Sequence, residues 1–448
     1  MNSRTRKSNY LSSCCLAGGL LLSIIGTRAN AQDTVEIITH EGEKENHEII
    51  DLPVSMTYPI DSLLSDWNIK TYITLKPDCN NASNENPVYP DSVYIKRMSY
   101  IPTIMELPYN EIVRKFIDLY TGQRMRNRVS IMLSVSNFYT PIFEHALDAY
   151  DLPLELKYLP IIESALNPSA VSRAGASGLW QFMIGTGKLY GLESNSLVDE
   201  RRDPIKSTWA AAHYLKDLYN IYNDWNLVIA AYNCGPGNVN KAIRRSGGKT
   251  DYWSIYPYLP RETRGYVPAF IAVNYVMSYY CDHNICPLET NIPPVNTDTI
   301  QVNQRLHFKQ ITEICNISIE ELKSLNPQYK KDIIPGGKTY NLRLPYEQLS
   351  AFIDKQDTIY THREKELFNN RTTVTASTRN PRSASSGGTT YTSADGVTYH
   401  KIKNGETLSV IAKRYRVSVN DLKIWNNLSG SQITAGKQLK ILKLGVTT

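Results

Sequence analysis

Helical periodicity marks the middle of the chain. Four apolar residues within the segment 111–117 have the spacing of a single helix face, namely Ile112, Val113, Phe116 and Ile117. Asp203 before Pro204 is typical of a capped helix start, and the alanine-rich segment 209–219 behind it indicates a buried helix. Strand-like alternation is scarce in this region. We therefore predict a mainly α-helical domain over residues 93–285.

An internal repeat follows this domain. A shift of 100 positions aligns the apolar residues of segment 299–345 with those of segment 399–442, so that Ile311 falls on Ile411. Each copy is predicted to form a short strand, two short helices and a closing strand. Two copies indicate a duplicated module and not a solenoid. The Ser- and Thr-rich segment 369–398 between them is typical of a flexible linker.

The N-terminal segment has the pattern of a secretory signal over residues 1–31, with basic residues, an uncharged apolar run over 11–26 and a small-residue cleavage site. A retained membrane anchor is the alternative. A lipoprotein form is less favoured, because Cys14 precedes the apolar run. No later run approaches the ~20 apolar residues of a membrane span, so none is expected in the mature chain. Residues 32–92 are polar and irregular, which predicts a poorly ordered N-terminal region.

Composition narrows the class of protein. The 448 residues allow about three domains at roughly 150 residues each. A hydrophobic share of 42% and a charged share of 21% are ordinary for globular proteins. The net charge of +6 comes largely from the signal segment, so no nucleic-acid partner is expected.

Cysteine spacing gives no metal or disulfide framework. Beyond the signal segment the number of cysteines is odd. Cys281 and Cys286 are close enough in sequence to form a bridge, and buried free thiols are the equally good alternative. C-x-x-C and H-E-x-x-H motifs are absent, so we expect no metal site and no cofactor.

One acidic residue stands directly behind an apolar run. Glu163 follows the segment 159–162, and burial among such residues would raise its pKa from ~4.3 toward 6. A carboxyl that stays protonated at neutral pH can donate the proton that glycosidic bond cleavage requires. The alternative is an ordinary glutamate at a helix end on a solvated surface.

Four segments together resemble the goose-lysozyme-like lytic transglycosylases, most closely the membrane-bound murein transglycosylase D type. The segments cover residues 158–168, 178–183, 231–237 and 259–268. The resemblance implies a lysozyme-like domain in which Glu163 is the catalytic acid and base, and Ser164 shapes the site beside it. It also implies the residues that would line the cleft, position the sugar or contact the carboxyl: Gln181, Tyr232, Asn233 and Tyr266.

The implied substrate is the glycan strand of peptidoglycan. In this family Glu163 would protonate the oxygen between N-acetylmuramic acid and N-acetylglucosamine, and the sugar's own 6-hydroxyl would then close onto C1, without water or cofactor. Glu262 is a second acid, but Arg261 and Arg264 flank it, which predicts an ion pair. The charged run 199–203 predicts a solvated turn before the next helix. A hydrolytic muramidase and a non-catalytic wall-binding scaffold are the alternatives.

The repeated units resemble LysM domains, which fold as βααβ and bind glycans that contain N-acetylglucosamine. In the second unit, the resemblance places the sugar against the opening loop formed by Gly405, Glu406, Thr407 and Leu408. The first unit has Arg305, Leu306 and His307 at that loop, which makes it a degenerate module and favours a spacer packed on the catalytic domain. The whole pattern implies a periplasmic, wall-associated protein.

Overall fold

The computed structural model describes residues 34–41, 44–57, 67–79, 85–290 and 297–368, and parts of 390–441. The chain divides into two compact units, residues 1–377 and 378–448. The predicted signal segment lies outside the described residues. No helix in the described part is both long enough and apolar enough to cross a membrane.

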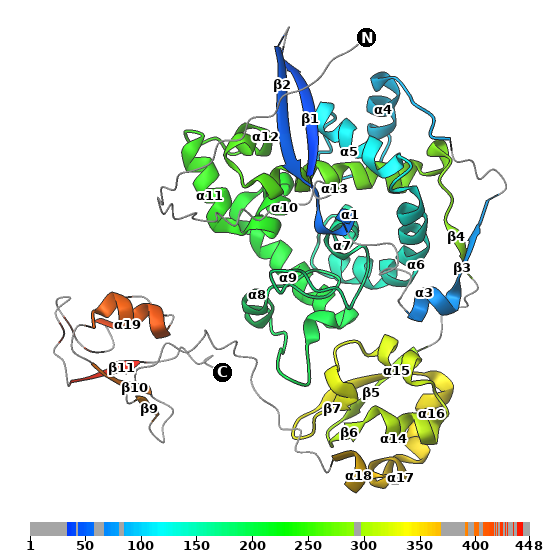
Figure 1. The fold of residues 1–448 in the computed structure, drawn as a ribbon, viewed down its shortest axis with the longest axis vertical. Helices are drawn as coiled ribbons and strands as arrows, with labels where there is room; N and C mark the ends of the chain where they lie inside the picture. The colour runs from blue at the N-terminus through cyan, green and yellow to red at the C-terminus, as the bar shows by residue number, and fades with distance from the viewer. Residues whose placement is uncertain are drawn as a thin grey trace, which may run out of the picture. The chain divides into compact units, whose positions relative to one another are not determined.

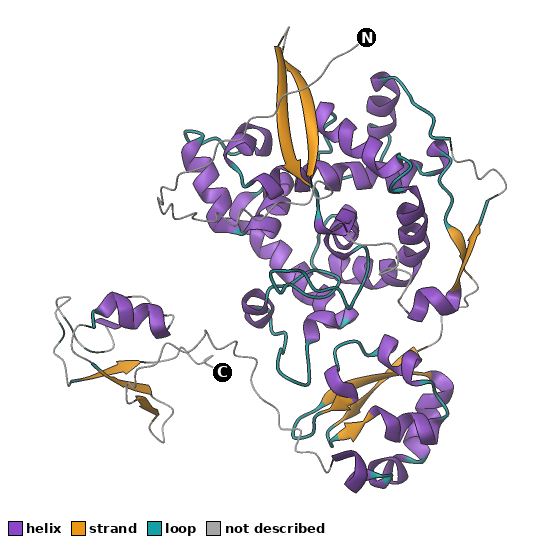
Figure 2. Ribbon diagram, in the orientation of Figure 1, coloured by secondary structure: helices purple, strands orange, loops and turns teal. Residues whose placement is uncertain are grey.

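A helical domain forms the larger part of the first unit (Figures 1 and 2). Its helices are α4 (Asp91–Met98), α5 (Glu111–Thr121), α6 (Arg126–Ala149), α7 (Leu159–Ser164), α8 (Ile184–Leu189), α9 (Pro204–Tyr222), α10 (Trp225–Cys234), α11 (Pro236–Arg245), α12 (Tyr252–Ile255) and α13 (Arg261–Tyr279). α13 is buried along most of its length and packs against α5, α7 and α10. The predicted mainly α-helical fold is confirmed.

Local signals predicted two of these helices correctly. Val113, Phe116 and Ile117 of α5 are fully buried, as their spacing indicates. The Asp203 side chain accepts hydrogen bonds from the first backbone N–H groups of α9, with Pro204 at the first helical position.

The first repeat forms the predicted strand–helix–helix–strand module. Its elements are β5 (Thr297–Val302), β6 (Leu306–His307), α14 (Phe308–Cys315), α15 (Ile319–Leu325), β7 (Ile333–Ile334) and β8 (Tyr340–Pro345), and β5 pairs antiparallel with β8. Three further helices follow, α16 (Tyr346–Asp354), α17 (Gln356–Thr361) and α18 (Glu364–Phe368). Phe352 and Ile359 of these helices complete the module's core, so the module extends beyond the predicted boundary at 345.

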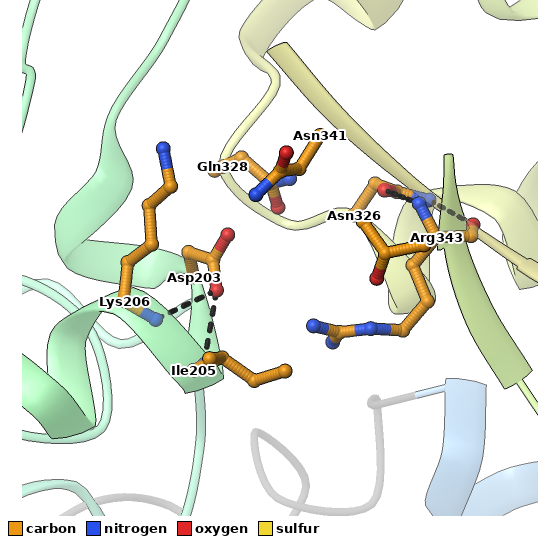
Figure 3. A pocket seen from close by; sticks show the side chains of 8 residues that line it. Asp203, Ile205, Lys206, Asn326, Gln328, Asn341 and Arg343 are labelled. Atoms are coloured by element: carbon orange, nitrogen blue, oxygen red, sulfur yellow. Dashed lines mark hydrogen bonds between the residues drawn. The ribbon is translucent and has the colours of Figure 1, made fainter. Parts of the chain in front are cut away.

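This module packs on the helical domain, as expected of a spacer. Leu197 and Val198 of the helical domain belong to the module's hydrophobic core. Backbone hydrogen bonds also join the two, including one of 2.8 Å from Asp199 N to Gln328 O. A polar pocket of about 50 Å³ lies at this junction, and Asp203 and Arg343 face it from opposite sides (Figure 3).

The second unit contains the other copy of the module. β9 (Thr390–Thr392), β10 (Thr398–Lys401) and β11 (Gln438–Ile441) form an antiparallel sheet in the order β11-β10-β9, and α19 (Leu408–Tyr415) packs on it. The first strand, first helix and closing strand lie where the sequence predicts them. β9 falls within the predicted linker, and residues 369–389 lie outside the described residues.

The described residues of the N-terminal region are ordered, which corrects the expectation for 32–92. β1 (Thr34–Glu41) and β2 (Lys44–Asp51) form an antiparallel hairpin, followed by α1 (Val54–Thr57), α3 (Trp67–Tyr72) and β3 (Ile73–Pro77). Ile37 and Ile50 of the hairpin are buried in the core of the helical domain. A two-stranded ribbon that buries so few residues looks polar in sequence, which explains the wrong prediction.

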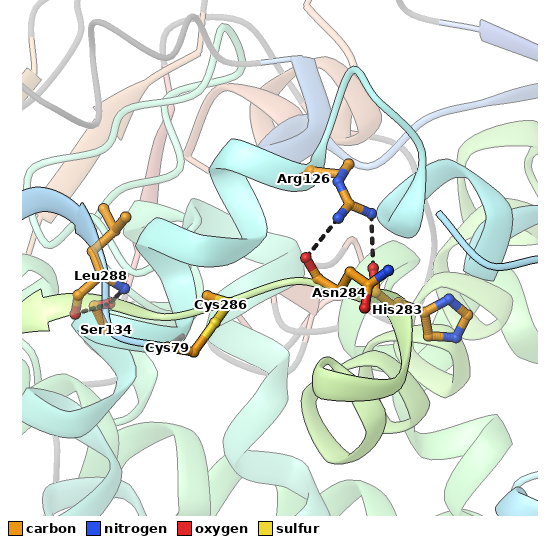
Figure 4. The surroundings of a disulfide bond; sticks show 7 residues. All are labelled: Cys79, Arg126, Ser134, His283, Asn284, Cys286 and Leu288. Atoms are coloured by element: carbon orange, nitrogen blue, oxygen red, sulfur yellow. Dashed lines mark hydrogen bonds between the residues drawn. A yellow bond between two sulfur atoms is a disulfide. The ribbon is translucent and has the colours of Figure 1, made fainter. Parts of the chain in front are cut away.

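A disulfide joins this region to the end of the helical domain. Cys79 pairs with Cys286, beside the pairing of β3 with β4 (Leu288–Thr290) (Figure 4). Neither expectation for Cys286 holds, because Cys281 is a free, exposed thiol and the bridge spans 207 positions of sequence. The N-terminal region is thereby part of the helical domain.

Candidate active site

Glu163 stands at the end of α7, a short helix held by its apolar residues. Leu159, Ile161 and Ile162 are at most 2% exposed and fix the helix in the core. The backbone turns left-handed at Ala165, with φ of 51°, which ends the helix directly after the Glu-Ser pair. Glu163 itself keeps partial exposure to solvent. The helix therefore holds the carboxyl at the edge of the core.

The Glu163 carboxyl accepts a hydrogen bond from the Tyr266 hydroxyl, which α13 supplies from 103 positions further along the chain. Burial raises the pKa of Glu163 to about 8; the Tyr266 hydrogen bond opposes this rise, and the charge of Glu262 adds to it. The carboxyl is therefore protonated at neutral pH. Burial and the nearby Glu163 charge also raise the pKa of Tyr266 well above its usual value, so the phenol remains a donor.

Two further predicted residues come from the C-terminal end of α10. The Tyr232 hydroxyl donates to the Trp180 carbonyl over 2.8 Å, and the charge of Glu163 contributes, after burial, to a raised pKa of Tyr232. Asn233 Oδ1 accepts a 2.8 Å hydrogen bond from Thr263 Oγ1 on α13. α7, α10 and α13 thus bring Glu163, Tyr232 and Tyr266 together.

Gln181 has a constrained backbone and an unsatisfied side chain. Its φ is 46°, and its Nε2 donates to the Gly178 carbonyl over 2.9 Å. Its Oε1 is buried and accepts no hydrogen bond within the described structure. A buried acceptor of this kind is costly unless a donor reaches it, which makes Gln181 a candidate contact for a hydroxyl or amide N–H.

The Ser164 side chain does not lie where it could contact a substrate. Its side chain is fully buried, and its hydroxyl lies 2.9 Å from the Leu179 carbonyl. It therefore ties α7 to the segment 178–183, which agrees with a role in shaping the site. A direct contact between this side chain and a ligand is not available in this structure.

Family models match three segments of the chain. Residues 140–255 match the transglycosylase SLT domain, residues 296–361 match the LysM-like domain of the lytic transglycosylase MltD, and residues 400–442 match the LysM domain. This chain carries an SLT domain and two LysM-type modules. The SLT match contains Glu163 and both α10 residues, whereas Tyr266 lies beyond its end.

Curated relatives agree with these matches. The chain is 30% identical over 295 residues to the membrane-bound lytic murein transglycosylase D of Escherichia coli K12, covering 65% of this chain and 60% of the relative. It is 35% identical over 124 residues to the soluble lytic murein transglycosylase of the same strain, covering 26% and 19%. The chain thus spans less than two thirds of each relative's length. A solved structure, the 70 kDa soluble lytic transglycosylase SLT70 of E. coli, is similar over 39% of this chain and 31% of that chain, with 27% identity and a TM-score of 0.30.

A buried ion pair holds the segment 175–182, which contains Gln181. Arg201 makes two 2.8 Å hydrogen bonds to Asp199 and donates from Nη1 to the carbonyls of Gly175 and Phe182. Both partners are at most 5% exposed, so the predicted solvated turn over 199–203 is wrong, although Asp203 caps α9 as expected. Both charged side chains can be buried here because each neutralises the other.

The ion pair predicted for Glu262 is also wrong. Arg261 pairs with Asp51 and Arg264 pairs with Glu48, both on the N-terminal hairpin. Glu262 is exposed and forms no ion pair with any residue that the structure describes. The sequence gives no sign of the partners Asp51 and Glu48, because nothing in their spacing connects them to α13.

The opening loop of the second LysM module is described in part. The Glu406 carboxylate pairs with the buried His400 and with Arg414, and Leu408 is a core residue with 2% exposure. Thr407 is exposed, whereas Gly405 lies outside the described residues. Of the four predicted glycan contacts, Thr407 therefore has a side chain positioned to meet a ligand.

In the part of the chain that the structure describes, no group of three or more His, Cys, Asp or Glu side chains is arranged to hold a metal ion. The pocket at the module junction contains none of the predicted catalytic residues.

Proposed function

We propose that this protein is a peptidoglycan lytic transglycosylase that cleaves the β-1,4 bond between N-acetylmuramic acid and N-acetylglucosamine and leaves 1,6-anhydromuramic ends. The observation that carries the proposal is the hydrogen bond from the Tyr266 hydroxyl to the Glu163 carboxyl, whose pKa burial raises to about 8. The SLT match and the two named lytic transglycosylases support the same reaction class.

In the first step, Glu163 transfers its proton to the glycosidic oxygen as the bond from this oxygen to C1 breaks. The N-acetylglucosamine hydroxyl leaves, and the muramyl acetamido group stabilises the positive charge at C1, a substrate-assisted route. Glu163 is now ionised, and the hydrogen bond from Tyr266 stabilises its negative charge.

In the second step, the ionised Glu163 takes the proton of the muramyl 6-hydroxyl while that oxygen bonds to C1. The attacking group belongs to the same sugar, so its high effective concentration replaces an activated water. Glu163 ends protonated, and no second carboxylate is required. Gln181, Tyr232 and Asn233 are the proposed sugar-positioning residues, and the buried Gln181 Oε1 offers an acceptor for a sugar donor.

The LysM modules have separate proposed roles. The second module binds glycan through its opening loop around Thr407 and keeps the enzyme at the wall. The first module is a spacer that packs on the SLT domain through Leu197 and Val198. The signal-like segment 1–31 and the glycan substrate favour a periplasmic location.

The test is the mass spectrum of products released from purified peptidoglycan by the full chain and by Glu163→Gln. We expect anhydro products from the wild-type protein and none from the variant, with wall binding retained. Glu106→Gln, an exposed acid in the same domain, is the matched control and keeps activity. Products heavier by one water would indicate a muramidase, and undiminished cleavage by Glu163→Gln would refute the assignment.

A further inference from the structure

The N-terminal hairpin packs against the first turn of α13, which is the turn that leads into Tyr266 (Figure 1). Arg264 Nη1 lies 2.6 Å from Glu48 Oε1, and Arg261 Nε donates to Asp51 Oδ2 over 2.9 Å. Both sides of this contact lie outside the residues matched by the SLT model. The matched segment therefore contains neither the hairpin nor the turn of α13 that it contacts.

Backbone packing at this contact is as close as a glycine allows. A Cβ atom added to Gly265 would lie 2.7 Å from the Asp51 carbonyl oxygen and 2.8 Å from Ile50 Cγ2. Ile50 is fully buried and cannot move aside easily. Because Gly265 directly precedes Tyr266, the position of β2 sets where the backbone of Tyr266 lies.

Helical spacing sorts the charges of this turn onto two sides. Arg264 and Gly265 lie three and four positions after Arg261, and these three residues share the side that faces β2. Glu262 and Tyr266 are four positions apart and share another side, next to Glu163. This separation explains why the negative field of Glu262 acts on Glu163 while both guanidinium groups are neutralised elsewhere.

Glu48 also organises the loop before the helix. The Tyr256 hydroxyl donates to Glu48 Oε2 over 3.0 Å, and Arg264 donates to the carbonyls of Pro257 and Leu259. The Glu48–Arg264 pair thus connects the hairpin, the segment 256–259 and the start of α13.

We infer that the β1–β2 hairpin is a positioning element of the active site: Asp51 and Glu48 hold Arg261 and Arg264 on β2, and so fix the turn that presents Tyr266 to Glu163. The inference rests on the proposed role of Glu163. The groups that face Glu163 are Tyr266 and Glu262 from α13 and Tyr232 from α10. Without the hairpin acids, Arg261 and Arg264 would lose the partners that hold this turn on β2.

The test is the pH profile of kcat/KM on purified peptidoglycan, measured with the full chain carrying Glu48→Gln and Asp51→Asn together. The Tyr266 hydrogen bond lowers the pKa of Glu163, and a turn that β2 no longer holds weakens this bond, so the alkaline limb should move up, in the same direction as in Tyr266→Phe. A shift of about half a pH unit raises kcat/KM at pH 9, relative to its value at pH 6, about 2.6-fold over wild type.

The matched control is Glu36→Gln together with Glu45→Gln, which removes two acids from the exposed part of the same hairpin. Its limb should stay at the wild-type position. Adding Tyr266→Phe to the contact variant should give no shift beyond that of Tyr266→Phe alone, because the hairpin acts through this hydroxyl, whereas a general loosening of the fold would add to it. If the double variant fails to fold, Glu48→Gln and Asp51→Asn are measured singly, each with a smaller shift.

An unmoved limb in the folded contact variants, with Glu163→Gln inactive, would overturn the hairpin inference and leave the proposed function intact. A shift of the same size in the Glu36 and Glu45 control would overturn it too, because the effect would then be one of net charge. Full cleavage by Glu163→Gln would instead overturn the proposed function, since no catalytic carboxyl would remain for the hairpin to position.

Discussion

Replacing Glu163 by glutamine should stabilise the protein in a pH-dependent way. The pKa of this carboxyl is about 8 in the folded protein, against 4.5 for the unperturbed group. Below pH 4.5 both the folded and the unfolded state hold the proton, so the raised pKa does not change the free energy of unfolding. As the pH rises from 4.5 to 8, only the unfolded state releases its proton, and the wild-type protein loses stability.

The size of this effect follows from the interval between the two pKa values. Each unit corresponds to 1.36 kcal/mol, so the full loss well above pH 8 is at most about 5 kcal/mol. Between pH 5 and pH 7 the wild-type protein should lose about 2.5 kcal/mol relative to the glutamine variant, which cannot ionise. In a helical domain of this size, this difference corresponds to ~5 °C in the unfolding midpoint.

Thermal unfolding of the full chain at pH 5, 7 and 8, at one scan rate, measures the difference. The midpoint of Glu163→Gln should rise relative to wild type from pH 5 to pH 8, whereas Glu106→Gln, which removes an exposed acid, should follow wild type. A difference between the two midpoints that stays constant with pH reflects the packing of the amide and carries no information about the pKa of Glu163. Parallel curves for wild type and Glu163→Gln would refute a raised pKa, and with it the protonated acid.

Three other predictions concern the acid, the ion pair and the modules. Cleavage by the wild-type protein should fall above pH 8 as Glu163 loses its proton, and a rate that stays flat to pH 10 would contradict this. Arg201→Ala leaves Asp199 buried without its partner and should lower the free energy of unfolding by about 3–5 kcal/mol, as measured by denaturant titration. Deleting residues 399–448 should weaken binding to sacculi in a pull-down assay but spare cleavage of soluble glycan fragments, whose loss would disprove modular action.

Local signals predicted the parts of the site that adjacent residues determine. The apolar run before Glu163 predicts a buried carboxyl, because burial of this run carries the next residue to the edge of the core. Asp203 and Pro204 predict the start of α9 for an equally local reason. The resemblance to lytic transglycosylases added Tyr266, whose contact with Glu163 no local pattern indicates.

Partners that are distant in sequence could not be predicted in this way. From their charges alone, Arg261 and Arg264 could pair with Glu262 or with any other acid. They pair with Asp51 and Glu48 because the folded hairpin brings these two acids to α13. Cys286 has a closer cysteine in sequence than Cys79, and the pairing of β3 with β4 decides between them. Spacing along the chain carries no information about such choices.

The segment matched by the SLT model does not contain the whole proposed site. The matched segment ends at residue 255 and supplies Glu163, but the hydroxyl that contacts its carboxyl belongs to Tyr266. Tyr266 in turn depends on a glycine contact with β2, which lies more than 80 residues before the match begins. A protein made of the matched segment alone would keep the acid and lose its hydrogen-bond donor. The hairpin and α13 therefore belong to the proposed active site as much as the helix that carries the acid.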